Sequence, residues 1–524
     1  MTPIRWRDEI ESRWPGQAQS SFEAQNALTE VTCTRAVLVE VCRFVVENWE
    51  LIFAGLIVEE GPAEWHLRYV FYGPGGWVHV RVSAPLAEKV FPSIVEWIHA
   101  ADWHEREAED LFGVRFEGHP HLGDFVLHND AWQESVEPMR HGFDAEAAFR
   151  KRAPDADWRP RRIVSEPGAF IMPIGPKFSG VTESVQFLLE TVGEDVIRSS
   201  SRLYYKWRAV EKLAEGKTVE EALLLAERFA ATTAFAHGLA FLLAIESPAG
   251  VDVPARARRL RVFLAELERF RQHAGAIQEI CESTALVVAT SQAGIFEEEL
   301  LRVSGELTGH RYLFGLLAPG GLLCDLPTEV CRRALDRSRD ILERLNELER
   351  RLCLSSSFLD RIEEVGAISA ATARAYSLVG PVARGSGLAR DLRRVRAYCG
   401  YEAFAFDVPT EQEGDGYARL RVLFAEARQS VRIMEQALAG LAQGRVSGAV
   451  ELRAGGALGA VEAPRGATFH WVRLDEGGLI QRYRVITPSF TNWHSFNLAA
   501  EKFAFQDFPI ILSTFDLSVA ENDR

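Results

Sequence analysis

The sequence has few cysteines, and none of them is spaced to hold a metal. The seven lie at positions 33, 42, 281, 324, 331, 353 and 399, and no two form a C-x-x-C pair. Metal sites built from local thiolates use such pairs, so the sequence excludes a site of this kind. We interpret all seven as small buried or surface residues of a protein in a reducing compartment.

Other absences narrow the class of protein. The net charge is -15, which argues against nucleic-acid binding, because that function needs clustered Lys and Arg. The N-terminal MTPIRWRDEIESRWPG has no apolar core of the kind a signal peptide requires, so we expect a cytoplasmic protein. The most apolar run, residues 229–245, is at or below the lower length limit for crossing a bilayer, and it predicts a buried core helix.

The chain is long enough for two or three domains, and its first part is predicted to be an α+β domain. Apolar positions at helical spacing predict a helix over 34–50. Alternating apolar and polar residues then predict three antiparallel strands within 51–85. A helical pattern over 91–113 ends at Gly113. We place the first domain at residues 1–140 and a charged, Pro-containing linker at 141–165.

The remaining domain, residues 166–524, is predicted to be mainly helical with a small β hairpin. The hairpin is expected around Gly193, where two strand-like runs meet. Amphipathic periodicity predicts long helices over 219–246, 254–283, 327–353 and 411–442. The predicted fold class of the whole chain is therefore α+β.

Few residue patterns point to chemistry by themselves. His119 and His121 in GHPHL form a loop pair that we interpret as structural, since no further ligand is evident nearby. The segment RGSGLARDLRR at 384–394 lacks both glycine-rich phosphate-binding fingerprints. A cluster of carboxylates alternates around one predicted helix, which makes it a weak acid/base candidate and favours surface ion pairs: Glu105, Glu107, Glu109 and Asp110.

Several arginines have apolar or Gly/Pro-framed neighbours. They are Arg208 with Glu211 in YYKWRAVEKL, Arg228 before the apolar helix, and Arg465 in EAPRG. A buried arginine is costly unless it is paired, so these residues either hold elements together or line a cleft.

At residues 101–122 the sequence ADWHEREAEDLFGVRFEGHPHL resembles the signature of the small hydrophilic subunit of respiratory complex I. The matching positions imply a structural role for residues of one helix and the loop after it: Glu105, Arg106, Glu107, Asp110, Gly113, Gly118, His119, Pro120 and Leu122.

The rest of the chain resembles the large subunit of membrane-bound, energy-converting NiFe hydrogenases of the formate hydrogenlyase type, and its complex I homologue. The resemblance rests on MPIGPKF, RLYYKWRAVEKLAEG, PARARRLRVFLAELERFRQHAG, LVGPVARGSGLARDLRR, EAPRGATFHW and ITPSFTNWHSF. In that hydrogenase type the two parts are fused in this order.

The resemblance also implies that the NiFe centre is missing. In the hydrogenases two pairs of cysteines hold the metals, and the corresponding positions here are Ala230, Thr233, Ser518 and Glu521. Nickel and iron in such sites require soft thiolate ligands, so we predict no NiFe centre and no hydrogen turnover. His237, which follows the first pair in the hydrogenases, is retained.

The complex I homologue lost the same cysteines and binds a quinone headgroup in the resulting cleft. Its headgroup tyrosine and its histidine-containing loop correspond here to Ala231 and to GPKFSGVTE at 175–183, so the usual hydrogen-bond partners are absent. In the H-R-G-x-E motif of the family, Arg208 and Glu211 remain. Glu211 is therefore our candidate for proton handling, and a structural salt bridge to Arg208 or another arginine is the alternative.

The resulting hypothesis is a peripheral-arm subunit of a complex I-related redox complex. It would pass electrons from an iron–sulfur cluster on a partner subunit to a small acceptor, with a quinone as one candidate, coupled to ion translocation. The chain itself would bind no cofactor, and it would lie on the inner face of the cytoplasmic membrane through antiporter-like membrane subunits. Glu211 and His237 would transfer protons in a cleft lined by Arg208, Arg228, Arg384, Arg465, Asp516 and Ser518.

Two alternatives from other classes remain open at this point. One is a noncatalytic scaffold or coupling subunit of the same complex. The other is a sensor whose arginines clamp a small anion.

Overall fold

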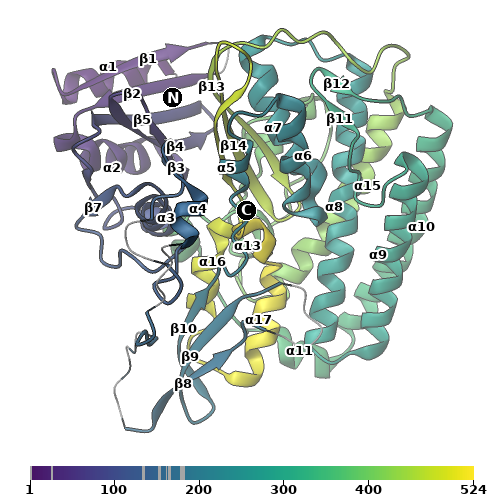
Figure 1. The fold of residues 1–524 in the computed structure, drawn as a ribbon. Coiled ribbons are helices and arrows are strands. Elements are labelled where there is room, and N and C mark those ends of the chain that lie inside the picture. The colour runs from purple at the N-terminus through teal and green to yellow at the C-terminus, as the bar shows by residue number, and fades with distance from the viewer. Residues whose placement is uncertain are drawn as a thin grey trace.

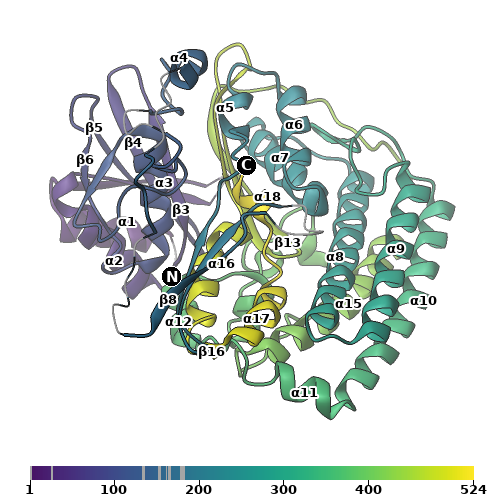
Figure 2. The same ribbon diagram turned by 60° about the horizontal axis from the view of Figure 1, so that its bottom comes forward.

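The computed structural model describes residues 3–24, 27–132, 136–150, 155–160, 162, 164, 167–177 and 183–524. A sheet-based N-terminal domain packs beside a larger, mainly helical part (Figures 1 and 2). The predicted α+β class is confirmed.

The N-terminal domain is built on a five-stranded sheet in the order β1-β2-β5-β4-β3. The antiparallel strands predicted from alternation are β3 (Ile52–Glu60), β4 (Glu64–Gly73) and β5 (Gly76–Pro85). The sequence analysis missed β1 (Ala18–Glu23) and β2 (Leu28–Cys33). Because β2 pairs with β5 in parallel, the sheet is mixed rather than purely antiparallel.

The two faces of this sheet have different neighbours. Val78 belongs to the core that includes residues of α1 (Pro3–Arg13) and α2 (Leu38–Trp49), the helix predicted over 34–50. Trp77, the preceding residue on β5, belongs to a cluster shared with the larger domain. Successive side chains of a strand point to opposite faces, so one face builds the domain and the other forms the interdomain contact.

Only the second half of the predicted helix over 91–113 is helical. Strand β6 (Val90–Pro92) pairs in parallel with β7 (Arg115–Glu117), and a 3-10 turn then leads into α3 (Asp102–Phe112). Pro92 has no backbone N–H to donate within a helix, and it lies in the short strand β6 instead. Gly113 ends α3 in the left-handed conformation, as expected of a C-terminal glycine.

A four-stranded sheet in the order β16-β10-β9-β8 follows the linker region. Its centre is the hairpin predicted around Gly193. The strands are β8 (Ala169–Ile174), β9 (Gln186–Val192), β10 (Asp195–Arg202) and β16 (Phe503–Ala504). The predicted domain boundaries, 140 and 166, stay predictions.

Long helices form the side of the molecule that is away from the N-terminal domain, on the right in Figure 1. The helices α8 (Ala255–Ser283), α10 (Thr328–Cys353) and α15 (Gly416–Ala439) correspond closely to those predicted from amphipathic periodicity. A fourth, α9 (Val287–Thr308), was not predicted. Helix α8 lies in the middle of this group, and most of its side chains are buried.

The single helix predicted over 219–246 is wrong. The chain forms α6 (Val219–Arg228), a 3-10 turn (Ala231–Thr233) and α7 (Ala234–Ala249), and the two helical segments are bent by 111°. The break lies at Ala230, whose backbone angles, φ of -135° and ψ of 89°, are not helical. No single helix in the described ranges is long and apolar enough to cross a membrane, although this bent pair meets both criteria when its halves are taken together.

A three-stranded sheet lies between α7 and the N-terminal domain, where the sequence predicted no sheet. It consists of β13 (Gly455–Ala463), β14 (Gly466–Leu474) and β15 (Ile480–Ile486). Helix α7 packs closely on β13, since a Cβ on Gly459 would lie 2.0 Å from the Ala240 carbonyl oxygen. Figure 1 shows these strands between the N-terminal sheet and the helices.

Shorter elements complete the fold. They are α4 (Ala145–Arg150), α5 (Val210–Ala214), β11 (Leu317–Ala318), β12 (Gly321–Leu322), α11 (Ser356–Ile362), α12 (Ala370–Ala375), α13 (Gly380–Gly385), α14 (Leu392–Val395), α16 (Pro488–Ala499), α17 (Phe508–Phe515) and α18 (Val519–Asn522).

Candidate functional site

The positions predicted to correspond to metal-binding cysteines lie at one buried point. Thr233, at the start of α7, donates a hydrogen bond of 2.9 Å to a carboxylate oxygen of Glu521. Ser518 caps α18 by accepting a hydrogen bond from the Glu521 N–H at 3.3 Å. Ala230 lies one turn before Thr233, and its carbonyl accepts a hydrogen bond from the Thr233 N–H. Two segments 288 residues apart therefore meet here.

Glu521 is fully buried and is surrounded by groups that favour its charged form. The Ser489 hydroxyl donates to it at 2.5 Å, and Arg465 Nη1 lies 3.5 Å away. Burial by itself would raise the pKa of Glu521, but His237 and Arg465 outweigh it and lower the pKa to about 2. Glu521 is therefore an anion at neutral pH.

Arg465 joins Glu521 to a second predicted cleft residue, Asp516. Its Nη2 lies 3.1 Å from the Asp516 carboxylate, and its Nε donates to the Asp516 carbonyl at 2.6 Å. Gln272 donates to the same carboxylate at 3.0 Å. One guanidinium thus holds two carboxylates at this point.

These residues do not fit a NiFe centre. A methyl group, two hydroxyls and a carboxylate stand at the four positions, and none of them is a soft ligand. The carboxylate is already engaged by Arg465 and by two hydroxyl groups. The absence of the centre stays a prediction.

A chain of buried polar groups leads away from Glu521. His237 Nε2 lies 3.6 Å from Glu521 Oε1. His237 Nδ1 is 3.1 Å from His470 Nε2, and His470 Nδ1 is 2.8 Å from the Tyr483 hydroxyl. All four side chains are buried. They connect α18, α7, β14 and β15 across the middle of the domain.

One arrangement of hydrogen atoms runs continuously through the chain. Burial raises the pKa of Tyr483 well above its usual value, so its hydroxyl keeps its proton, and in this arrangement it donates to His470 Nδ1. Burial and the neighbouring His237 hold the pKa of His470 well below its usual value, so His470 is neutral and its proton lies on Nε2. That proton is donated to His237 Nδ1. In the same arrangement the remaining His237 hydrogen is on Nε2, which lies 3.6 Å from the Glu521 carboxylate, beyond the length of a hydrogen bond.

Glu211 lies in a cage of arginines. Its Oε1 accepts from Arg484 Nη1 and from Arg524 Nε, both at 3.2 Å, and Arg482 Nη2 is 3.6 Å from Oε2. The Val485 N–H also donates to it at 2.9 Å. Burial opposes the charge, but Arg484, Arg524 and Arg482 prevail and lower the pKa of Glu211. This geometry matches the salt-bridge alternative with arginines other than Arg208.

The same arginines bind the N-terminal domain. Arg484 Nη2 donates to Glu107 at 2.5 Å, and Arg524 Nη2 donates to Glu107 at 2.8 Å. Glu107 lies on α3 and is 5% exposed, so a buried four-residue network ties α3 to α5 and β15.

Comparison with known proteins identifies both domains. The model of the respiratory-chain NADH dehydrogenase 30 kDa subunit matches residues 31–148, and that of its 49 kDa subunit matches residues 289–453 and 446–524. This chain fuses domains of the 30 kDa and 49 kDa types of complex I. The resemblance inferred from the sequence motifs is confirmed.

Individual relatives match this chain over most of their length. Formate hydrogenlyase subunit 5 of Escherichia coli (strain K12) is 29% identical over 454 residues, which cover 86% of this chain and 79% of that protein. The C/D subunit of NADH-quinone oxidoreductase from Methylococcus capsulatus is 26% identical over 492 residues, 85% of this chain and 83% of that protein. The C/D subunit from Acinetobacter baylyi is 28% identical over 493 residues, 84% of this chain and 80% of that protein. The chain is thus a complex I-related oxidoreductase subunit of a type found in multisubunit enzymes.

Not every arginine predicted to line the cleft lies close to Glu521. Arg208 does lie beside it, since its Nη1 donates to the Phe229 carbonyl and its backbone N–H to the Asp523 carbonyl, both at 2.8 Å. Arg228 is 44% exposed and pairs with Glu227.

Arg384 belongs to a different buried ion cluster of the larger domain. Its Nε lies 2.5 Å from Glu426, and its Nη1 donates to Glu462 at 2.8 Å. Arg465, by contrast, pairs with Asp516 and Glu521. Arg384 therefore anchors α13 to α15 and β13 instead of facing Glu521.

Two signature residues of the N-terminal domain, Glu105 and Glu107, are buried, which corrects the expectation of surface ion pairs for them. Glu105 is fully buried and accepts from the Ser93 hydroxyl and the Ile94 N–H. Burial raises its pKa to about 8. Asp110 accepts three backbone N–H groups of residues 125–127, so it fixes that loop.

The remaining signature residues also hold the loop after α3. Arg106 donates to the Gly123 carbonyl, and its guanidinium lies 4.5 Å from the Phe125 ring centroid. His119 Nδ1 accepts from the His121 N–H at 3.0 Å across the exposed Pro120. In the part of the chain that the structure describes, no three His, Cys, Asp or Glu side chains are arranged to hold a metal ion.

Sequence reasoning missed the residues that connect the site. They are His470, Tyr483, Arg482, Arg484 and Arg524. The signal for His470 was present in EAPRGATFHW, where it follows Arg465 by five positions. The loop 175–183, which we compared with the quinone-binding loop, lies partly outside the described residues, at 178–182.

Proposed function

We propose that this chain is the core peripheral-arm subunit of a membrane-associated redox complex related to complex I. It passes electrons from an iron–sulfur cluster on a partner subunit to a small acceptor of the quinone class. It has no hydrogenase activity. The names of its relatives, the C/D subunits of NADH-quinone oxidoreductase and formate hydrogenlyase subunit 5, support a redox complex with further subunits. Antiporter-like membrane subunits would hold it at the inner face of the cytoplasmic membrane and couple it to ion translocation.

The observation that carries the proposal is the chain from Glu521 through His237 and His470 to Tyr483. Its groups are buried, it begins at the positions that correspond to the metal-binding cysteines of the hydrogenases, and its members lie 2.8–3.6 Å apart. Histidine exchanges protons through two nitrogens, so such a chain moves a proton without moving a side chain far.

The proposed reaction balances with two electrons and two protons. Electrons would come one at a time from the iron–sulfur cluster of the partner subunit, and the two quinone oxygens would take up the two protons as the quinol forms. Proton transfer by positioned groups of this kind contributes about 10²- to 10⁴-fold to a rate. Glu211, held as an anion by Arg484 and Arg524, fixes the position of α5 against β15.

The test uses the intact complex, purified from native membranes through a tag on this chain. Reduced benzyl viologen supplies electrons and decylubiquinone accepts them. We expect an iron–sulfur subunit to copurify, quinol to form and no hydrogen to appear. An intact complex that forms hydrogen, or that reduces no quinone, would refute the proposal.

A second candidate is favoured by a specific observation, the arginine cage of Glu211. Four buried charged residues that hold two domains together are also what a noncatalytic coupling subunit requires. If the chain is a noncatalytic coupling subunit, substitutions of His237 or His470 leave the turnover of the complex unchanged. If the chain is the redox subunit, the same substitutions slow the turnover.

A further inference from the structure

The helix that carries His237 begins without a cap from its own segment. Its first three residues, 234–236, have no polar side chain, and within the described stretch 231–249 the Thr233 hydroxyl makes no hydrogen bond to the first turn of α7. The backbone of Thr233, with φ of -126° and ψ of 31°, lies outside the extended region typical of a capping residue, and its hydroxyl donates to Glu521 instead. The buried N–H groups of this first turn therefore need acceptors from elsewhere in the chain.

Glu268 of the neighbouring helix α8 supplies these acceptors. One of its carboxylate oxygens accepts from the Phe235 N–H at 2.8 Å, and the other accepts from the Ala236 N–H at 3.0 Å. Glu268 is 3% exposed, so water does not compete for these contacts. The preceding helix, α6, has the usual arrangement, in which the side chain of Thr218 accepts from the Glu221 N–H. The cap of α7 thus comes from another helix, although a threonine precedes both helices.

The charge of Glu268 changes near neutral pH. Burial raises its pKa to about 7, opposed by Arg271 and Arg269 of its own helix and by the two N–H groups of α7. The carboxylate form offers an oxygen to each N–H, whereas the protonated form carries a hydrogen on one of its oxygens. The cap is therefore stronger above about pH 7 than below it.

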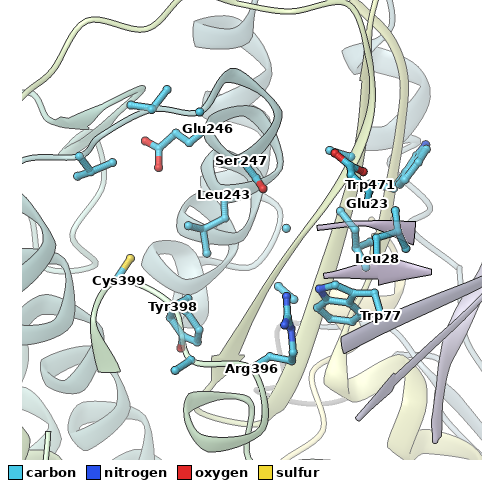
Figure 3. Close-up of a pocket in the computed structure, with 18 of the residues that line it drawn as sticks. Glu23, Leu28, Trp77, Leu243, Glu246, Ser247, Arg396, Tyr398, Cys399 and Trp471 are labelled. Carbon is cyan, nitrogen blue, oxygen red and sulfur yellow. The ribbon is translucent and has the colours of Figure 1, made fainter. Parts of the chain in front are cut away.

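Helix α8 holds α7 at a second place, near the C-terminal end of α7. Arg261 of α8 donates hydrogen bonds of 2.6 and 2.8 Å to Glu246 of α7, and both side chains are buried. Figure 3 shows Glu246 with Leu243 and Ser247 on this part of α7, where the helix borders a cavity of about 330 Å³ between the two domains. Glu246 follows His237 by nine residues, which is about 14 Å along a helix. It is therefore a matched anchor of the same helix, distant from the Glu521 site.

We propose that Glu268 is a positioning residue of the Glu521 site. By accepting two N–H groups, it fixes the start of α7. This contact keeps the Thr233 hydroxyl on Glu521. It also keeps the His237 ring 3.1 Å from His470. The effect of Glu268 on turnover rests on the proposed function, whereas its effect on Thr233 does not.

The first test needs no turnover and uses urea denaturation of the purified full-length chain at pH 8. Glu268→Gln keeps the shape of the side chain, but it presents one oxygen and one amide nitrogen to the two N–H groups. Thr233→Val removes the hydroxyl that binds Glu521. If Glu268 holds Thr233 in place, Thr233→Val should lower the denaturation midpoint in the Glu268→Gln background by about half, or less, of what it does in the wild type.

Glu246→Gln is the matched control, because it weakens the other anchor of α7 on α8. In this background Thr233→Val should lower the denaturation midpoint as much as it does in the wild type.

The second test measures quinol formation by the intact complex between pH 6 and pH 8, with reduced benzyl viologen as donor and decylubiquinone as acceptor. The ratio of the wild-type rate to the Glu268→Gln rate should increase as the pH rises through about 7, because only the wild type gains a carboxylate that completes the cap. The ratio of the wild-type rate to the Glu246→Gln rate should stay constant over this range.

The inference is overturned if Thr233→Val has the same effect on the midpoint in the wild-type and Glu268→Gln backgrounds. It is also overturned if the complex turns over and the ratio of the wild-type rate to the Glu268→Gln rate does not change with pH. A wild-type complex that reduces no quinone would refute the proposed function, and the denaturation result would then decide whether Glu268 positions Thr233.

Discussion

Two buried carboxylates of the larger domain, Glu211 and Glu521, have opposite surroundings. Glu211 is enclosed by three arginines, two of which also bind Glu107 of the other domain. Glu521 has one arginine, which it shares with Asp516, and otherwise hydroxyl groups and a histidine. Both carboxylates have a lowered pKa.

The difference separates a clamp from a candidate reaction site. Arginine cannot give up its proton in a protein, so the Glu211 cage fixes charge and geometry and offers no proton to move. Histidine and tyrosine both donate and accept, so the groups next to Glu521 provide a chain of polar contacts, two of which are hydrogen bonds. Sequence motifs favoured Glu211 for proton handling, and the geometry favours the chain that starts at Glu521.

Breaking the clamp should have the largest effect on stability. Arg484→Met leaves Glu107 and Glu211 short of a partner in a buried site, so we expect a loss of about 3–5 kcal/mol in the free energy of unfolding. Urea denaturation of the purified chain measures it.

The exposed pair Arg150–Glu146 provides the control for this substitution. Arg150→Gln should cost less than about 1 kcal/mol. Equal losses of stability in the two variants would mean that the buried arginines around Glu211 do not hold the two domains together.

Neutralising the other carboxylate should cost less. Glu521→Gln retains the shape of the side chain, and Arg465 keeps Asp516 as its partner, so we expect a loss of about 1–3 kcal/mol at pH 7. The lowered pKa contributes stability that is present above the unfolded value of about 4.3 and is lost as the pH falls through about 2. The gap between variant and wild type should therefore shrink below pH 4, as measured by denaturation at several pH values.

Glu105 sharpens the comparison, because it is a buried carboxylate with hydrogen bonds but no arginine. Its pKa is raised to about 8, so it contributes stability that is present below the unfolded value of about 4.3 and is lost as the pH rises through about 8. Glu105→Gln should remove this pH dependence, so the stability that the wild type loses between pH 5 and pH 8, about 3–4 kcal/mol, should not be lost by the variant. An unchanged pH profile would contradict the assignment.

The smallest effect on stability is expected for Tyr483→Phe. It removes one buried hydrogen bond to His470 and should cost about 1 kcal/mol. Thermal denaturation measures this cost. A loss as large as that of Arg484→Met would show that Tyr483 serves packing more than hydrogen bonding.

The sequence predicted part of the site through its motifs. It placed Thr233, Ser518 and Glu521 at one point, because the resemblance matches two distant segments, and the structure brings them together. It did not predict the break at Ala230, since alanine is the strongest helix former and nothing local opposes a continuous helix.

The partners of Glu211 could not be predicted from the sequence. Arg484 reaches Glu211 only because β15 lies beside α5, and Arg524 reaches it from the far end of the chain. Such contacts depend on tertiary packing. The three-stranded sheet that positions them was itself missed, because its strands are buried on both faces and lack clear alternation.

The most direct test of the account compares quinone reduction by the intact complex containing wild-type chain or His470→Gln, with reduced benzyl viologen as donor and decylubiquinone as acceptor. The account predicts that assembly is retained and that the substitution slows quinol formation at least tenfold, with a larger solvent deuterium isotope effect than in the wild type. A rate and an isotope effect equal to those of the wild type would contradict the account and leave the chain as a noncatalytic scaffold of its complex.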